Sequence, residues 1–366
     1  MLHICLSFDH ELFLGDNFAT EKEILIDTTD RLLGVLEKHQ VSGTFFTDVC
    51  SIMRYEELGM NEFPNLVKEQ LQRLVNSGQD VQLHIHSNWL KSCYVDGKWN
   101  FDTDSYRVQY YTEANREKNN NWTMMQIIKK GKELLENLLR SEWNEYSCVA
   151  YRAGGFCIQP EKELVSCLIE NGIFIDSSIA PGISALNCVN SYDFRENPRK
   201  VMNWFISPTS GINGFAESCE QKKIFEVPIA TANRDFVQWI LTKKKYINTR
   251  PHRGSFISFK ECKGEDTRIE RNDIFSRLRK FYSMPVVLSL DSYDAQILYS
   301  FVKQIYRKYR CDDHDVYISV ICHPKLVNEK LLDNLDRFIK NMQKIPNVRF
   351  CNMKHIYEKV KKEGKI

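Results

Sequence analysis

The stretch LHICLSFDHEL, residues 2–12, opens the chain as an apolar, strand-like run that ends in polar residues. A helix is expected from about Glu21, because Thr20 and Glu23 have the spacing of a capping box and apolar residues follow at helical intervals. A buried strand followed by an amphipathic helix is a βα unit. This opening therefore predicts an α/β protein.

Strand-like and helix-like segments alternate along nearly the whole chain. Further apolar strand-like runs lie at residues 43–49, 80–86, 146–152, 173–178, 201–207, 224–231, 285–291, 315–323 and 348–352. Amphipathic helical segments lie at residues 65–76, 124–140, 160–170, 295–307 and 326–342, with a short helix from residue 354. This alternation predicts βα units around a mainly parallel sheet or barrel.

The length of 366 residues is compatible with two domains or with one large α/β barrel. Three polar insertions interrupt the alternation, at about residues 98–122, 187–223 and 243–280. In an α/β barrel, long loops after the strands stand over the mouth where ligands bind. These insertions are candidate walls of a binding site, although mobile surface loops would have the same composition.

Composition argues against several classes of function. A formal net charge of +2 and an isoelectric point near 7.9 provide no general attraction for nucleic acids or anionic membranes. The chain opens without a signal-like segment, and no apolar run approaches the roughly 18 residues of a spanning helix. We therefore expect a cytoplasmic protein. The 12 cysteines are scattered without a CxxC pair, which is typical of reduced, mostly buried thiols.

Polar residues of chemical interest stand at the carboxyl ends of the expected strands, the edge where α/β folds build their sites. Asp9 and Glu11, at the end of the first strand, point to one side, whereas His10 between them faces the other way. Carboxylates in such positions often cap helices or pair with arginines. The pair by itself leaves its role open.

His84 and His86 repeat this geometry in QLHIH, residues 82–86. Both imidazoles lie on one face of a strand, roughly 6–7 Å apart, a distance that one metal ion can bridge. Two histidines with hydrogen bonds in a turn would show the same pattern. Carboxylates and histidines from different strands would converge at one end of a barrel. The presence of several candidate ligands at one place favours a metal site.

Arg152 follows another strand, in YRAGGF at residues 151–156. Its guanidinium could bind a carboxylate through two hydrogen bonds, and a pair with Asp9 would orient a catalytic base. Gly154 and Gly155 indicate a tight turn or a close approach of the backbone to a ligand. Alone, the glycines indicate no more than a tight loop.

Asp176 and His323 stand at the ends of two later strands, and Pro324 suits the first turn of a helix. A contact with Asp176 would fix the tautomer of His323 and raise its pKa, as a general acid requires. Taken separately, an aspartate at a strand end is usually a helix cap, and a lone histidine there is usually structural.

Seven short motifs occur in a characteristic order: SFDHE, GTFF, QLHIHSNW, YRAGGF, IDSS, FEVP and ICHP. In this order and at these strand ends, they resemble the polysaccharide deacetylases of the NodB-homology type, carbohydrate esterase family 4. The resemblance spans about residues 2–357. It implies a single catalytic domain over residues 1–366, folded as a distorted, incompletely closed (β/α) barrel of about seven parallel strands.

The resemblance also implies roles for individual residues. The first motif makes Asp9 the catalytic base, and the second makes His84 a ligand of a metal that is commonly zinc. Arg152 corresponds to the arginine that orients the base. His323 corresponds to the general acid, and Asp176 to the carboxylate that supports it.

The sequence departs from the family pattern at the metal ligands. The family has two adjacent aspartates where this chain has Asp9, His10 and Glu11, so we assign Glu11 as the acidic ligand, with His10 as the alternative. The family's second histidine stands four residues after the first, where this chain has Asn88. We therefore expect His86 to replace it.

The activity implied is hydrolysis of an N-acetyl or similar acyl group on an amino sugar, in surface polysaccharide synthesis. Asp9 would take a proton from metal-activated water, and His323 would protonate the departing amine. Main-chain amides near Gly154 and Gly155 would stabilise the oxyanion. The expected partners are carbohydrates, either polymeric, lipid-linked or nucleotide-linked, and not nucleic acids.

These residues are also compatible with two other functions. An amidohydrolase on a barrel also has an HxH motif, but on its first strand, where this chain has carboxylates. A metal-free relative could bind carbohydrate without catalysis. Either kind of carbohydrate-binding protein could stack sugars on aromatic residues of the first insertion, namely Trp99, Tyr106, Tyr110, Tyr111 and Trp122.

Overall fold

The computed structural model describes most of the chain. The described residues are 1–102, 104–186, 189–196, 202–216, 220–245, 247, 252–256 and 285–366. The first expected insertion is described except for residue 103, and the second is described in part. Most of the third insertion lies outside the described residues.

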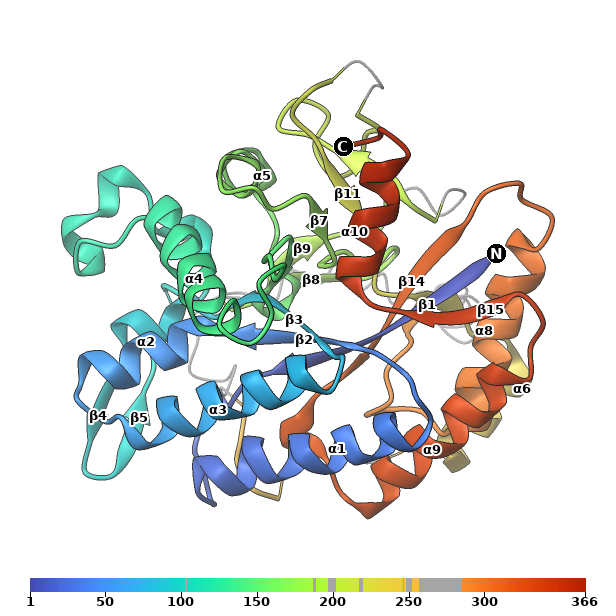
Figure 1. Ribbon diagram of the computed structural model, residues 1–366, viewed down its shortest axis with the longest axis horizontal. Coiled ribbons are helices and arrows are strands. Elements are labelled where there is room, and N and C mark those ends of the chain that lie inside the picture. The colour runs from blue at the N-terminus through green and yellow to red at the C-terminus, as the bar shows by residue number, and fades with distance from the viewer. Residues whose placement is uncertain are drawn as a thin grey trace, which may run out of the picture.

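A nine-stranded sheet forms the centre of the described structure, in the order β10-β11-β7-β6-β3-β2-β1-β14, with β15 also paired to β1 (Figure 1). Its strands are β1 (Leu2–His10), β2 (Thr44–Asp48), β3 (Asp80–Ile85), β6 (Ala150–Ala153), β7 (Ile175–Asp176), β10 (Trp204–Ile206), β11 (Ile224–Glu226), β14 (Val316–Cys322) and β15 (Val348–Cys351). The pairings are parallel except between β10 and β11. The curled, open sheet confirms the expected α/β class and the distorted, incompletely closed barrel.

The opening strand β1 is paired along both of its edges in this sheet, and all of its residues are buried. One of its edges pairs with β14 along residues 2–8. The other edge is shared by β15, over residues 2–5, and β2, over residues 7–10. A strand enclosed on both edges and both faces needs a nearly continuous apolar sequence, which residues 2–8 supply.

The sheet curls until the chain beyond β11 reaches the free edge of β14. Ile229 forms an isolated parallel bridge with Ser319, and Ser289 forms another with Ile321. Single bridges replace continuous strand pairing here, so the barrel is incompletely closed. The expected strand at residues 285–291 is correspondingly short, because β13 (Pro285–Val287) pairs with β12 (Thr231–Asn233) in a separate ribbon.

Helices lie outside the sheet, with α1, α3 and α9 along one side of the view in Figure 1. They are α1 (Asp27–Lys38), α2 (Val49–Glu57), α3 (Glu62–Asn76), α4 (Met124–Leu139), α5 (Glu161–Glu170), α6 (Phe236–Lys245), α8 (Ala295–Tyr309), α9 (Glu329–Gln343) and α10 (Met353–Lys362). The capping box is present, since the Thr20 amide donates to Glu23 and the Glu23 amide donates to the Thr20 hydroxyl. Helix α2 was not predicted; Asp48 caps it by accepting from the amide of Cys50.

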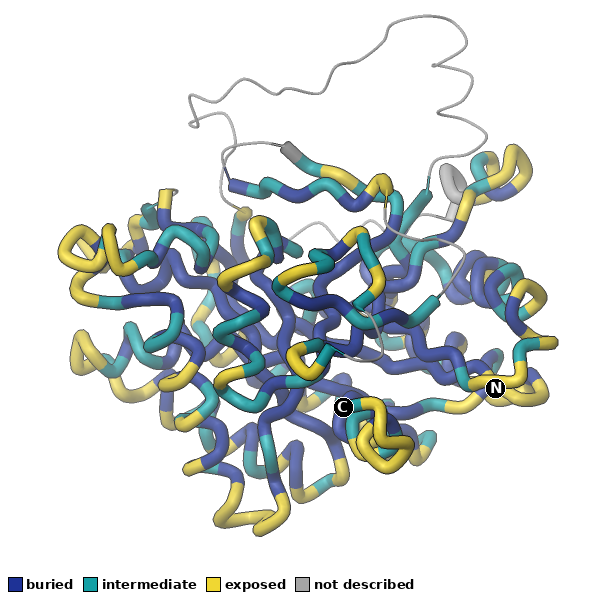
Figure 2. The backbone as a smooth tube through the Cα atoms, turned by 90° about the horizontal axis from the view of Figure 1, so that it is seen from above, coloured by how far each residue is buried: buried dark blue, intermediate teal, exposed yellow. Residues whose placement is uncertain are grey.

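Buried residues form a continuous centre, and exposed residues lie mainly at the periphery (Figure 2). The cysteines in the described part of the chain are free thiols. None of the described helices combines the length and apolar composition needed to cross a membrane.

Candidate active site

The register of the parallel strands brings three of the predicted residues, Asp9, His84 and Arg152, to one edge of the sheet together with Asp48. Asp48 at the end of β2 is level with His84 in β3, and His84 is level with Arg152 in β6. Asp9 lies near the end of the adjacent strand β1. These four polar side chains are buried, so each requires a partner in the protein.

Glu11, His84 and His86 form a candidate metal site. The Glu11 Oε2 atom lies 3.1 Å from His84 Nε2 and also contacts His86 Nε2. The three potential ligand atoms lie within 4.8 Å of one another, and all three residues are buried. One carboxylate and two imidazoles are a donor set that suits Zn²⁺ and similar divalent ions. The residues present therefore fit the metal that the sequence predicted.

Hydrogen bonds orient the two imidazoles. His84 Nδ1 lies 2.8 Å from the Arg152 carbonyl oxygen, so this nitrogen carries the proton and Nε2 turns toward Glu11. The main-chain amide of His86 donates to Asp48 Oδ1 at 3.0 Å. Asp48 thus anchors both the start of α2 and the segment that carries His86.

The charges of the cluster favour an ionised Glu11. Burial alone would raise the pKa of Glu11, but Lys325 and His86 together hold it well below the usual value. Burial would lower the pKa of His84, but its hydrogen bond to Glu11 and the nearby carboxylates outweigh this and raise it. A bound metal would take the place of the proton on His84.

His10 does not belong to this cluster, which corrects the alternative assignment. Its Nε2 atom lies 2.9 Å from Gln70 Oε1, and burial lowers its pKa to about 4. The alternation of side chains along β1 turns His10 away from Asp9 and Glu11. Asn88, at the family's usual histidine position, is buried, and its side chain forms no hydrogen bond with the described residues.

Asp9 is held by Arg152, as the sequence predicted. Arg152 Nη1 lies 2.8 Å from Asp9 Oδ1, and the guanidinium is completely buried. The expected bidentate contact with Asp9 is absent, because Nη2 instead donates to three hydroxyls, those of Ser7, Ser177 and Ser319. Only Oδ1 of Asp9 is engaged by the guanidinium, which leaves Oδ2 for the other side of the site.

His323 lies beside Asp9 and Glu11, with its Nε2 atom 3.8 Å from Asp9 Oδ2 and 3.9 Å from Glu11 Oε1. Its Nδ1 atom lies 2.6 Å from Asp291 Oδ2, and its main-chain amide donates to Asp291 Oδ1. Burial would lower the pKa of His323, but Asp291 and Asp9 raise it above the usual value.

The predicted contact between Asp176 and His323 is wrong. Asp176 instead accepts hydrogen bonds from the hydroxyl and amide of Ser178, next to the buried Glu226. In the order of the sheet, β7 lies on the far side of β6, β3 and β2 from β1. Asp291 is close because Ser289 bridges to β14 just before His323. Its signal in the sequence is the apolar run at residues 285–291, which ends in this aspartate.

Lys325 is a second residue that the sequence analysis missed. Its Nζ atom lies 2.6 Å from Glu11 Oε1 and 3.2 Å from the Leu12 carbonyl oxygen, and the residue is buried. It occupies η8 (Pro324–Leu326), directly after His323. A lysine in a short polar turn carries no sequence signal that would distinguish it from a surface residue.

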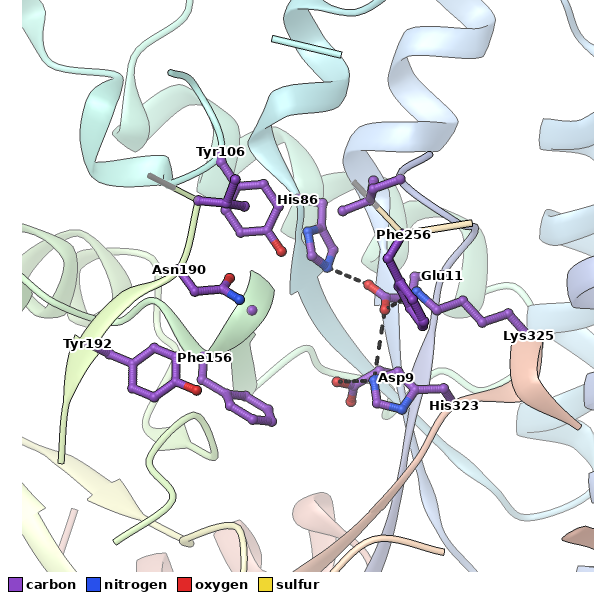
Figure 3. Close-up of a pocket in the computed structure, with 13 residues that line it drawn as sticks. Asp9, Glu11, His86, Tyr106, Phe156, Asn190, Tyr192, Phe256, His323 and Lys325 are labelled. Atoms are coloured by element: carbon purple, nitrogen blue, oxygen red, sulfur yellow. Dashed lines mark hydrogen bonds and ion pairs between the residues drawn. The ribbon is translucent and has the colours of Figure 1, made fainter. Parts of the chain in front are cut away.

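A cavity of about 350 Å³ opens onto these groups (Figure 3). It is lined by Asp9, Glu11, Leu14, His86, Tyr106, Gly155, Phe156, Val189, Asn190, Tyr192, Phe256, His323 and Lys325. Tyr106, Tyr192 and Phe256 come from the first, second and third insertion. Each insertion thus supplies part of the wall, although Trp99 and Tyr111 of the first insertion pack in the core instead.

The glycine pair after β6 allows the main chain to lie close to the candidate metal ligand His86. A side chain at Gly154 would lie 2.5 Å from the Ile85 carbonyl oxygen and 2.8 Å from His86 Nδ1. Gly155 has a φ of +57°, and a side chain there would meet Asn190 and Tyr106. Both glycines are therefore required by geometry at the cavity wall.

No model of a protein family matches the sequence, and no curated protein matches it. Among solved structures, a protein assigned as a polysaccharide deacetylase from Mycobacterium smegmatis shares 13% identity and a TM-score of 0.48, covering 99% of this chain and 91% of its own. Another, from Pseudomonas aeruginosa PAO1, shares 13% identity and a TM-score of 0.47, covering 100% and 92%. A carbohydrate esterase family 4 pseudoenzyme from Bacillus anthracis shares 9% identity and a TM-score of 0.34, covering 97% and 64%. At low sequence identity, the chain is thus similar over nearly its full length to solved structures of polysaccharide deacetylases, members of carbohydrate esterase family 4 among them.

Proposed function

We propose that this protein is a metal-dependent hydrolase that removes an N-acetyl or similar acyl group from an amino sugar. One observation carries the proposal. A carboxylate, Asp9, and an imidazole, His323, face each other across 3.8 Å, beside a cluster of three metal-ligand side chains and at the base of one cavity. Amide hydrolysis by metal-activated water needs a base, an acid and a metal site in this proximity.

Asp9 is the proposed general base. Arg152 engages one of its oxygens, and the guanidinium is itself fixed by three hydroxyls. The carboxylate is therefore oriented with Oδ2 toward His323 and the cavity. In this role it would accept a proton from the water that attacks the acyl carbon.

Glu11, His84 and His86 would hold the metal, and Zn²⁺ is the proposed ion because two imidazoles and one carboxylate leave a coordination position open for water. When bound, the metal would polarise the acyl carbonyl and lower the pKa of a water molecule. Gly155 lines the cavity, and its main-chain amide is the proposed donor to the developing oxyanion.

His323 is the proposed general acid. The contact with Asp291 orients the ring and raises its pKa, which favours the protonated form that a general acid needs. It would donate this proton to the amine nitrogen as the C–N bond breaks. The hydroxyl of the water ends on the acyl carbon, so the products are acetate and a free amino sugar.

The cavity wall supports a carbohydrate as the substrate. Four aromatic side chains line it, namely Tyr106, Phe156, Tyr192 and Phe256 (Figure 3). Aromatic rings present apolar faces on which the C–H faces of sugars can pack, and the tyrosines add hydroxyl groups. A polymeric, lipid-linked or nucleotide-linked amino sugar of surface polysaccharide synthesis, met in the cytoplasm, is the proposed substrate class.

The test is release of acetate from a panel of N-acetylated substrates of these three kinds, with protein as purified, after chelation and after addition of Zn²⁺. We expect release that chelation abolishes and Zn²⁺ restores. Release that chelation does not affect would contradict the metal-dependent mechanism. Sugar binding without release, by a protein that holds no metal, would favour the non-catalytic carbohydrate-binding alternative. Hydrolysis of non-carbohydrate amides alone would favour an amidohydrolase.

A further inference from the structure

Lys325 is a buried cation that contacts a proposed metal ligand and has no part in the chemistry described above. Only 4% of the residue is exposed, and its ammonium lies 2.6 Å from Glu11 Oε1. It also donates to the Leu12 carbonyl oxygen and lies over the rings of Phe13 and Phe256. Burial of an ammonium is costly unless it is paired, so Glu11 is the partner that keeps it there.

The two oxygens of Glu11 are divided between different partners. Oε2 faces His84 and His86, whereas Oε1 is bonded to Lys325. A carboxylate can bind a metal through one oxygen or through both. Binding through both would require Oε1 to leave the ammonium, which would then be buried without a counter-ion.

The charges at the edge of the cavity are also balanced in pairs. Arg152 is paired with Asp9, and Lys325 is paired with Glu11. A divalent ion that binds at Glu11 therefore meets a positive charge close by. The same three ligands would attract the ion more strongly if the positive charge of Lys325 were absent.

We propose that Lys325 is a positioning residue that restricts Glu11 to metal binding through one oxygen and weakens the affinity for the metal. Coordination positions that a second Glu11 oxygen would occupy are thereby left for water and the acyl oxygen. This inference rests on the proposed metal-dependent hydrolase and concerns its metal site.

The test compares Lys325→Met, which removes the charge at similar volume, with Lys325→Arg, which retains it. Lys354→Met is the matched control, because Lys354 is also buried but belongs to α10 and bonds to the Glu145 carbonyl oxygen. Metal-free proteins are titrated with Zn²⁺ against a chromophoric chelator and with Co²⁺ by visible absorption. Circular dichroism checks that each variant is folded.

We expect Lys325→Met to bind Zn²⁺ at least about tenfold more tightly than the wild type. Its Co²⁺ absorption should be weaker, because a second oxygen raises the coordination number. Its kcat should fall about tenfold or more with little change in KM, because positions for the reacting groups are lost. Lys325→Arg should stay close to the wild type in Zn²⁺ affinity and in Co²⁺ absorption. Lys354→Met should also match the wild type in these two properties.

Unchanged or weaker metal binding by folded Lys325→Met would overturn the inference. If that variant does not fold, Lys325→Gln removes the same charge and is judged by the same criteria. A wild type without affinity for Zn²⁺ or Co²⁺ would overturn both this inference and the proposed function. The predicted metal-binding changes in a protein that releases no acyl group would support the role of Lys325 and contradict the hydrolase.

Discussion

Asp291 and His323 form the closest contact of the proposed acid, with Oδ2 of the aspartate 2.6 Å from Nδ1 of the histidine. The same carboxylate accepts from the main-chain amide of His323 through its other oxygen. Both the ring and its backbone are therefore held by one residue, and Nε2 is directed toward Asp9 and Glu11. This arrangement leads to a prediction for the pH dependence of catalysis.

Asp291→Asn should shift the alkaline limb of the kcat profile to lower pH. The carboxylate raises the pKa of His323, and a general acid is active only while protonated. Loss of the negative charge lowers that pKa, by about one unit or more, so activity is lost at lower pH than in the wild type. Steady-state kcat, measured from about pH 5 to about pH 10, would give the size of the shift.

Asp176→Asn is the matched control for this prediction. Asp176 is bonded to Ser178, whereas His323 is bonded to Asp291, so the alkaline limb should stay in place. An alkaline limb that moves in Asp176→Asn and stays in Asp291→Asn would reverse the assignment.

The purified protein should hold about one divalent ion, and His84→Ala should lose it. Loss of a residue that only supports a ligand reduces metal affinity by up to about 100-fold. Loss of a direct ligand should therefore reduce metal affinity by more than this. His10→Ala should retain the metal, because His10 contacts Gln70 on the other side of β1. Elemental analysis and chelator titration measure both variants; metal loss in His10→Ala with an intact fold would contradict the ligand set.

Asp9→Asn should retain the metal and lose activity. The substitution keeps the shape of the side chain but removes the group that accepts a proton, at a cost in kcat of about 10²–10⁴-fold. Acetate release and metal content, measured on the same preparation, separate the two effects. Full deacetylation by Asp9→Asn would eliminate this residue as the base.

Arg152→Met should lower the free energy of unfolding by about 3–5 kcal/mol, because it leaves Asp9 buried without its cation. The double variant Asp9→Asn, Arg152→Met should recover part of this loss, since no charge is then left unpaired. Urea denaturation provides the values. As a control, Arg73→Met removes an exposed ion pair with Asp30 and should cost less than about 1 kcal/mol.

Gly154→Ala should weaken metal binding although Gly154 is not a ligand. The added carbon would lie 2.8 Å from His86 Nδ1 and 2.5 Å from the Ile85 carbonyl oxygen, so His86 must move. Chelator titration should show reduced affinity for Zn²⁺. Gly34→Ala in α1 meets nothing within 4 Å and should leave the affinity unchanged, with stability equal or higher by up to about 1 kcal/mol.

The sequence was sufficient for the fold class and for the placement of several residues of the candidate site. Strand and helix periods are local properties, and they correctly predicted β1, β3, β14 and the capping box at Thr20. Side-chain alternation along a strand is also local. It placed Glu11 on the side of Asp9 and turned His10 away, as the structure has them.

Contacts between distant strands depended on the tertiary structure. The sequence placed Asp176 and Asp291 alike, each at the end of an apolar run, and offered no way to choose between them as the partner of His323. The choice follows from the curl of the sheet, which brings Ser289 against β14 and leaves β7 several strands away.

The opening stretch LHICLSFDHEL by itself determined a buried strand that presents Asp9 and Glu11 on one face, because the period of a strand is set by its own backbone. Which cation each carboxylate meets was decided only by the closing of the barrel. Arg152 reaches Asp9 from β6, and Lys325 reaches Glu11 from the turn after β14. Both contacts join residues more than a hundred positions apart, and no local pattern encodes the packing that brings them together.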